Sequence, residues 1–202
     1  MEIRNTSFSN NWAIWVYPDK LPEISEKKVM LTREWNNRVK LYLQKGGTVL
    51  LLADTAQVKS DVPPCFSSIS WNAVWSGTLG ILCNPKHALF KHFPTEEHSN
   101  WQWFDLVRNS KPMLLDHTTY EFKPLVQIIP DWNNNRKIGL IFEAKVGKGK
   151  LMVTSIAFDR IMAHSPVARQ MYYSLVNYLN SPDFSPEVTL TNEMIDKIFI
   201  QP

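Results

Sequence analysis

Cys83 is a residue whose type and position could support catalysis. It directly follows the short apolar run of residues 79–82, which could form a strand. A cysteine at the end of a strand can act as a nucleophile when a neighbouring base and small residues activate its thiolate. Here Asn84 and Pro85 follow instead, and proline lacks a backbone N–H that could stabilise an oxyanion. Cys83 is therefore a candidate nucleophile without the neighbours it needs.

His164 is the candidate base, because it stands just ahead of the last long helical pattern. A catalytic histidine needs a carboxylate or similar group to orient its ring. Ser165 and Pro166 occupy the following positions, where an acidic residue would be expected. The sequence thus predicts no complete catalytic site. The alternative of a cysteine-dependent amidohydrolase or amidotransferase-like enzyme rests on Cys83 and His164.

Residues 98–105 form a second informative segment, in which tryptophans alternate with polar side chains. Indole rings can stack on the C–H faces of sugars, while amides and carboxylates bond sugar hydroxyl groups. Residues 131–136 have a similar composition. The carbohydrate-binding candidates are His98, Trp101, Gln102, Trp103, Asp105, Trp132, Asn133 and Arg136. The alternative is that these tryptophans pack an irregular loop against a sheet, since large aromatic residues most often serve burial.

Motifs for metals and cofactors are lacking. His87, His92 and His98 fall close together, but their spacing fits a zinc site only loosely and further ligands are missing. The chain contains no glycine-rich dinucleotide or phosphate-binding motif before a helix. Retaining glycosidases need two carboxylates about 5 Å apart, and no such pair can be assigned from the sequence. We expect neither metal nor cofactor.

Composition narrows the class of protein further. The 202 residues suit one domain, and the net charge of +3 is too small and dispersed to favour nucleic acid. No segment reaches the length of about 18 apolar residues that spans a membrane. The first residues lack the apolar core of a secretory signal, so the compartment stays open. Cys65 and Cys83 need not pair, and both can be buried free thiols.

The elements that must position these residues are visible in the apolar pattern. Residues 12–17 read as a strand, residues 32–45 as a helix and residues 48–53 as a strand buried on both faces, which together predict a βαβ unit. Residues 54–112 show weak periodicity, so they form either a functional loop or elements that the pattern misses. Strands at residues 113–115, 125–129, 138–142 and 150–156 predict antiparallel hairpins. Ser165 caps a helix with an apolar face, and residues 194–199 dock as a helical tail.

Three segments carry a resemblance to a known family. Residues 11–18 (NWAIWVYP), 93–103 (FPTEEHSNWQW) and 143–151 (EAKVGKGKL) resemble an accessory domain near the C-terminus of some bacterial β-galactosidase-like proteins of glycoside hydrolase family 2. The similarity spans roughly residues 11–179, and the tryptophan-rich motif is its most specific part. It implies a flavodoxin-like fold, similar to class I glutamine amidotransferases but without their catalytic triad. The fold class expected is thus α/β, a sheet flanked by helices with antiparallel hairpins in the C-terminal half.

The same resemblance implies the organisation and role of the chain. Residues 1–10 would be the tail of a preceding domain or an edge strand, and residues 11–202 a single α/β domain with a C-terminal docking segment. The catalytic carboxylates of the parent enzyme would lie in a separate barrel domain. The partners would be other domains of that glycosidase, with carbohydrate as a further candidate and oligomerisation left open. A role in bacterial carbohydrate metabolism follows, in the periplasm or outside the cell if the parent enzyme is exported.

Overall fold

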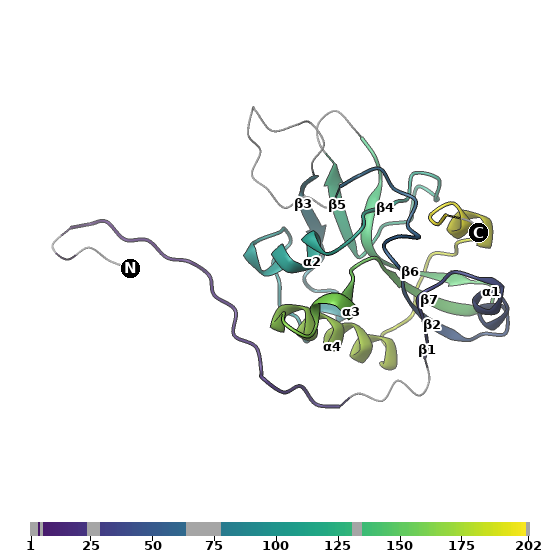
Figure 1. Ribbon diagram of the computed structural model, residues 1–202, viewed down its shortest axis with the longest axis horizontal. Helices are drawn as coiled ribbons and strands as arrows, with labels where there is room; N and C mark the ends of the chain where they lie inside the picture. The colour runs from purple at the N-terminus through teal and green to yellow at the C-terminus, as the bar shows by residue number, and fades with distance from the viewer. Residues whose placement is uncertain (1–3, 5, 24–28, 64–77, 131–134, 201–202) are drawn as a thin grey trace.

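A seven-stranded open sheet forms the centre of the molecule, in a computed structural model that describes residues 4, 6–23, 29–63, 78–130 and 135–200 (Figure 1). The strand order is β1-β2-β7-β6-β5-β3, with β4 paired to β6. Strands β1, β2 and β7 run parallel, and the remaining pairs are antiparallel. The strands are β1 (Met30–Thr32), β2 (Thr48–Leu52), β3 (Thr78–Cys83), β4 (Met113–Leu114), β5 (Val126–Pro130), β6 (Ile138–Val146) and β7 (Gly149–Thr154).

Helices cover both faces of this sheet, as the mixed α/β prediction required. The longest, α4, begins where expected, because the Ser165 side chain accepts a hydrogen bond from the Ala168 amide and Pro166 opens the first turn. The helices are α1 (Asn37–Gln44), α2 (Phe104–Arg108), α3 (Phe158–Ile161), α4 (Pro166–Asn180) and α5 (Asn192–Asp196), and the 3₁₀ turns are η1 (Ala88–Phe90) and η2 (Trp101–Trp103).

The strand–helix–strand unit at the start of the fold is present, but its first strand is not the predicted one. Residues 12–17 lie outside the sheet, and the position next to β2 is taken by β1. The helix also begins later than residue 32, because Thr32 ends β1 and the side chain of Asn36 caps α1 instead. Gly46, with a φ of 92°, follows the end of α1, close to the predicted end at residue 45.

Strand β2 shows why the core has two halves. Leu50 packs with the residues of α2, α3 and α4, whereas Val49 and Leu51 pack with those of α1 and α5. All three side chains are buried, which confirms the prediction of a strand covered on both faces. Figure 1 shows α2, α3 and α4 on one side of the sheet and α1 on the other.

The weakly periodic middle of the chain contains the short strand expected at residues 79–82, which is the edge strand β3. It also contains elements that the apolar pattern missed, namely both 3₁₀ turns and α2. The outer edge of β3 is partly covered, because Leu82 bridges to His98 and the Cys83 amide donates to the Glu97 carbonyl. Gly80 is required there, since its φ is 140° and a Cβ would lie 2.6 Å from the Ser99 hydroxyl oxygen.

The C-terminal half forms the predicted hairpin and the predicted docked tail. Strands β6 and β7 pair from Ile141 and Thr154 to Val146 and Gly149 around a tight turn. At the far end, Ile195, Ile198 and Phe199 are buried against the α1 side of the sheet. No helix among the described residues is long and apolar enough to cross a membrane.

Candidate functional site

Cys83, the candidate nucleophile, lies at the end of β3 with its thiol already engaged. Its Sγ donates to the Glu96 carbonyl oxygen at 3.2 Å. Burial, together with the nearby charge of Glu97, raises the pKa of this thiol to about 11. A catalytic cysteine requires the opposite shift, toward the thiolate at neutral pH. At neutral pH the Cys83 thiol therefore stays protonated.

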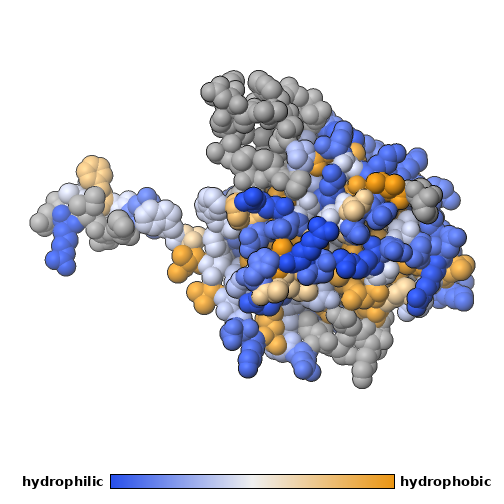
Figure 2. All heavy atoms as spheres, in the orientation of Figure 1, coloured by the Kyte–Doolittle hydropathy of each residue, from blue (hydrophilic) through white to orange (hydrophobic). Residues whose placement is uncertain are grey.

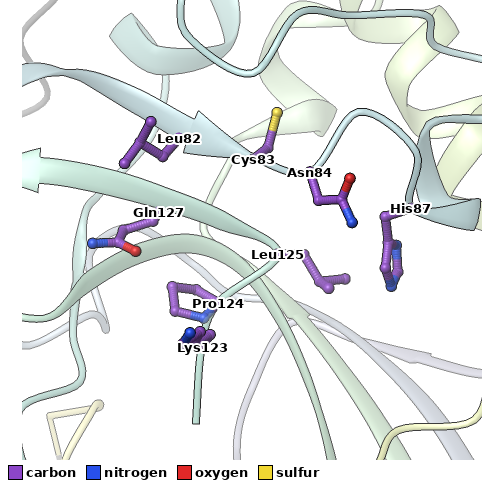
Figure 3. Close-up of a pocket in the computed structure, with 8 residues that line it drawn as sticks. All are labelled: Leu82, Cys83, Asn84, His87, Lys123, Pro124, Leu125 and Gln127. Atoms are coloured by element: carbon purple, nitrogen blue, oxygen red, sulfur yellow. The ribbon is translucent and has the colours of Figure 1, made fainter. Parts of the chain in front are cut away.

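A shallow groove of about 310 Å³ lies beside this strand end, between the end of β3 and the segment that leads into β5 (Figure 3). Its lining residues are Leu82, Cys83, Asn84, His87, Lys123, Pro124, Leu125 and Gln127. The close-up shows the Cys83 sulfur pointing away from His87. The two groups therefore do not converge on a common point in the groove.

His164, the candidate base, lies in the turn between α3 and α4 and is exposed. Its backbone amide bonds to the Ile161 carbonyl, and no hydrogen bond in the described part of the chain joins its ring to Cys83. The next residue, Ser165, is committed to capping α4. The structure thus does not assemble Cys83 and His164 into a nucleophile and base.

The two tryptophans of residues 98–105 have opposite environments. The Trp101 side chain is 72% exposed and contacts the Phe104 ring at 5.4 Å between centroids. The Trp103 side chain is fully buried, and its Nε1 donates to the Thr95 hydroxyl at 2.8 Å. Trp103 also packs edge-on against Phe93. Trp103 is therefore a core residue, and Trp101 is the one of the pair that a ligand could reach.

Gln102 is also part of the scaffold. It is only 3% exposed, and its Nε2 donates to the Tyr17 hydroxyl at 2.9 Å and the Pro94 carbonyl at 3.0 Å. Burial raises the pKa of Tyr17, so its hydroxyl stays protonated. Gln102 consequently ties the N-terminal segment to the domain and is not placed to bind a sugar hydroxyl.

Two other polar candidates near α2 have different partners. Asp105 accepts a 2.7 Å hydrogen bond from the Ser165 hydroxyl, which links α2 to the first turn of α4. His98 is exposed, with its Nε2 3.5 Å from the Glu96 carboxylate. Glu96 also accepts from the Asn100 side chain, and Asn100 caps η2. Of these two candidates, His98 is the one whose side chain is exposed to solvent, and it lies three residues before Trp101 in the sequence.

Arg136 lies at a different place, in a groove of about 640 Å³ that follows the carboxyl end of β2. Its guanidinium bonds to the carboxylates of Asp61 at 3.0 Å and Asp116 at 3.2 Å. The remaining lining residues are Thr55, Ala56, Val58, Lys59, Ser60, Asp61, Lys111, Leu114 and Ile200. Trp132 and Asn133 fall outside the described residues. None of Arg136's polar partners comes from residues 98–105.

The histidines considered for metal have structural roles. His87 caps η1, since its Nδ1 accepts from the Leu89 amide, and burial lowers its pKa. His92 packs edge-on against Tyr173. In the described ranges, no group of three or more potential ligands could hold a metal ion. Cys65 lies outside those ranges.

A half-buried polar contact between α4 and β6 was not singled out from the sequence. Tyr178 OH donates to Glu143 Oε2 at 2.8 Å, and His87 packs edge-on against the Tyr178 ring. Burial is the main cause that raises the pKa of both Glu143 and Tyr178. A charged residue directly after the apolar run of residues 138–142 was the available signal, because such a residue needs a partner.

The two grooves and the exposed Trp101 are separate features. Among the described residues, none of the three brings a nucleophile and a base together. A comparison with curated proteins finds no match. A family model, described as a domain of unknown function (DUF8487), matches residues 30–200. That match covers the whole sheet and every helix, and it begins after the N-terminal segment. The chain belongs to the DUF8487 family.

Proposed function

We propose that this chain is a non-catalytic accessory domain of a bacterial β-galactosidase-like glycoside hydrolase. The link to glycoside hydrolases rests on the resemblance of residues 11–18, 93–103 and 143–151. The observation that carries the non-catalytic part of the proposal is the state of Cys83. Its thiol is protonated, bonded to a backbone carbonyl and not joined to His164. A domain that keeps the nucleophile position without an activating base suits structural contact better than chemistry.

The finer fold belongs to the same proposal. The parallel set β1, β2 and β7, covered by helices on both faces, supports a flavodoxin-like sheet related to class I glutamine amidotransferases. The antiparallel strands β3, β5 and β6 extend that sheet on one side.

Reading the gene upstream of Met1 tests the proposal directly. We expect it to encode a β-rich domain and a barrel with two catalytic carboxylates. The purified 202-residue chain should hydrolyse neither aryl β-galactosides nor glutamine. An upstream frame without glycosidase domains, or glutaminase activity that is lost in Cys83→Ser, would overturn the proposal.

Carbohydrate contact is a second candidate role, and the exposure of Trp101 is the observation that favours it. An exposed indole, three residues after the solvent-accessible His98 in the sequence, offers a stacking platform. The buried Trp103 and the engaged Gln102 and Asp105 leave this platform smaller than the sequence predicted.

A titration with a panel of galactosides and plant glycans, followed by tryptophan fluorescence, tests this second role. Binding should change the emission of the native chain, and Trp101→Ala should remove the change. Trp12→Ala is the matched control, because Trp12 is also an exposed tryptophan. A flat response of the native chain to the whole panel would rule out the platform.

A further inference from the structure

The groove beside Arg136 lies at the end of the sheet where open α/β proteins bind their ligands. Strands β1, β2 and β7 are parallel, so their carboxyl ends meet at one edge of the sheet. The chain leaves β2 toward the α1 face, where Val58 is buried, and leaves β7 toward the opposite face, where α3 and α4 pack. Such a reversal between neighbouring strands opens a crevice that commonly holds a ligand.

Backbone hydrogen bonds hold the walls of this groove in place. On one wall, the Lys59 amide donates to the Ile198 carbonyl at 2.8 Å, which ties the segment after β2 to the C-terminal tail. On another, the Lys111 amide donates to the carbonyl of Ser155, directly after β7, at 3.1 Å. The groove is therefore preformed, and its volume of about 640 Å³ lies in the range of small-molecule sites.

Positive side chains outnumber negative ones in the lining. Lys59, Lys111 and Arg136 line the groove, and Asp61 is the one carboxylate among the described lining residues. Arg136 bonds to Asp61 and Asp116 through Nη1 and Nε, so its Nη2 has no bonded partner within the described ranges. In the same ranges, no ion pair joins either lysine to a carboxylate. The two lysines therefore keep their charges uncompensated.

Lys111 gives the clearest indication that the ligand is an anion. This residue is half-buried, and burial of an ammonium group is costly unless an opposite charge compensates for the lost hydration. A bound anion supplies the charge that the described part of the chain does not. The hydroxyl groups of Thr55 and Ser60 line the same groove and can donate to the oxygens of such a ligand.

The surroundings of the groove favour a small ligand over a protein partner. In Figure 2, the surface around β4 and the C-terminal tail is mainly hydrophilic, with only small apolar patches. Protein-binding surfaces more often present one large apolar patch. Inside the groove, the apolar lining residues suit the carbon skeleton of a compact molecule, and they are Ala56, Val58, Leu114 and Ile200.

We propose that this groove binds a small organic anion whose phosphate or carboxylate group contacts Lys111 and Lys59. The free Nη2 of Arg136 is a further donor to that group. Asp61 and Asp116 hold the guanidinium in position from the other side. The apolar lining then contacts the skeleton of the ligand.

Isothermal titration calorimetry of the 202-residue chain at low ionic strength tests the site. The probes are glucose 6-phosphate, glucuronate and inorganic phosphate, with glucose as the neutral comparison. At least one of the two organic anions should bind more tightly than both glucose and inorganic phosphate. Lys111→Gln should weaken that binding at least about ten-fold, through the loss of a charge-assisted hydrogen bond. Lys123→Gln is the matched control, because Lys123 is an exposed lysine at the other groove.

Each outcome of the titration decides the question. Tighter binding of glucose 6-phosphate assigns a phosphate group to the ligand, and tighter binding of glucuronate assigns a carboxylate. The inference is overturned if neither organic anion binds at millimolar concentration, if glucose or inorganic phosphate binds as well as they do, or if Lys123→Gln weakens binding as much as Lys111→Gln. Lys59→Gln replaces Lys111→Gln if that variant does not fold, since Lys59 is exposed.

This site and the accessory-domain function stand or fall separately. Neither Cys83 nor Trp101 is among the residues that line the groove. An upstream gene without glycosidase domains would leave the anion site intact, and a failed titration would leave the accessory function intact.

Discussion

The Tyr178 hydroxyl donates a 2.8 Å hydrogen bond to Glu143 Oε2 and thereby joins α4 to the middle of β6. Burial raises the pKa of Glu143, while the bond from Tyr178 opposes that shift. The carboxyl group therefore depends on this one hydroxyl for part of its stabilisation inside the α4 side of the domain.

Tyr178→Phe should lower the free energy of unfolding by about 1–3 kcal/mol, the cost of losing a hydrogen bond to a buried polar or charged group. Urea denaturation at neutral pH measures the change. Tyr173→Phe is the matched control on the same helix, because within the described ranges the Tyr173 hydroxyl has no hydrogen bond and the ring only packs against His92. Equal stability of the Tyr178→Phe and Tyr173→Phe variants would contradict the role of the contact.

Glu143→Gln should change how stability depends on pH. An acid whose pKa is raised by folding holds its proton more tightly in the folded state. The native chain therefore loses stability as the pH rises from the unfolded value of 4.5 through the folded value. Glutamine can still accept from Tyr178 but has no charge to desolvate. At pH values above the folded pKa, the stability of the variant relative to the native chain should be higher than at pH values below 4.5. A difference in unfolding free energy that stays constant with pH would refute the assignment.

His87→Asn should reduce the stability that the protein loses when the pH is lowered. Burial lowers the pKa of His87 below 6.5, so the unfolded chain binds a proton that the folded chain excludes. The native protein thus loses stability as the pH falls below 6.5 through the lower folded value. Asparagine can also cap η1 and carries no titrating ring. Denaturation between neutral and acidic pH should show a smaller loss for the variant.

The βαβ region shows how much of the fold was predictable. Strand β2 was identified because five apolar or β-branched residues in a row are typical of a strand covered on both faces. Residues 12–17 have equally strong strand propensity, yet they lie outside the sheet. Propensity describes a segment that suits a strand, but it does not say which sheet receives it.

Cys83 should react slowly with alkylating reagents. With a pKa of about 11, little thiolate is present at neutral pH. In a Cys65→Ser background, the rate with iodoacetamide at pH 7 should fall below that of a cysteine in a short peptide. The rate should keep increasing up to strongly alkaline pH. Reaction faster than the peptide would restore the cysteine-dependent enzyme as a candidate.

Trp101 and Trp103 should respond very differently to truncation. Trp103→Ala removes a fully buried indole and should cost about 3–5 kcal/mol of unfolding free energy. Trp101→Ala removes a mostly exposed ring and should change stability by no more than about 0.5 kcal/mol. Thermal denaturation of both variants is sufficient, and similar losses would show that Trp101 is also structural.

The same pair shows why the candidate site was harder to predict than the fold. Both residues share one motif and similar neighbours, so composition alone could not separate a surface ring from a core ring. The distinction arises from the 3₁₀ turn η2, which directs Trp103 toward Phe93. Likewise, Arg136 was grouped with the tryptophans by composition, but its partners Asp61 and Asp116 lie at another groove. Such pairings depend on tertiary contacts between distant segments.

The pairing of β2 with β7 has a consequence for how the chain folds. Thr48 lies beside Lys150, so the parallel centre of the sheet closes only after all the chain between them has been made. Closing so long a loop is entropically costly and slows folding. During synthesis, β2 can pair with β1, but its other edge stays unpaired until β7 leaves the ribosome much later. We expect slow refolding and a need for chaperones early in the life of the chain.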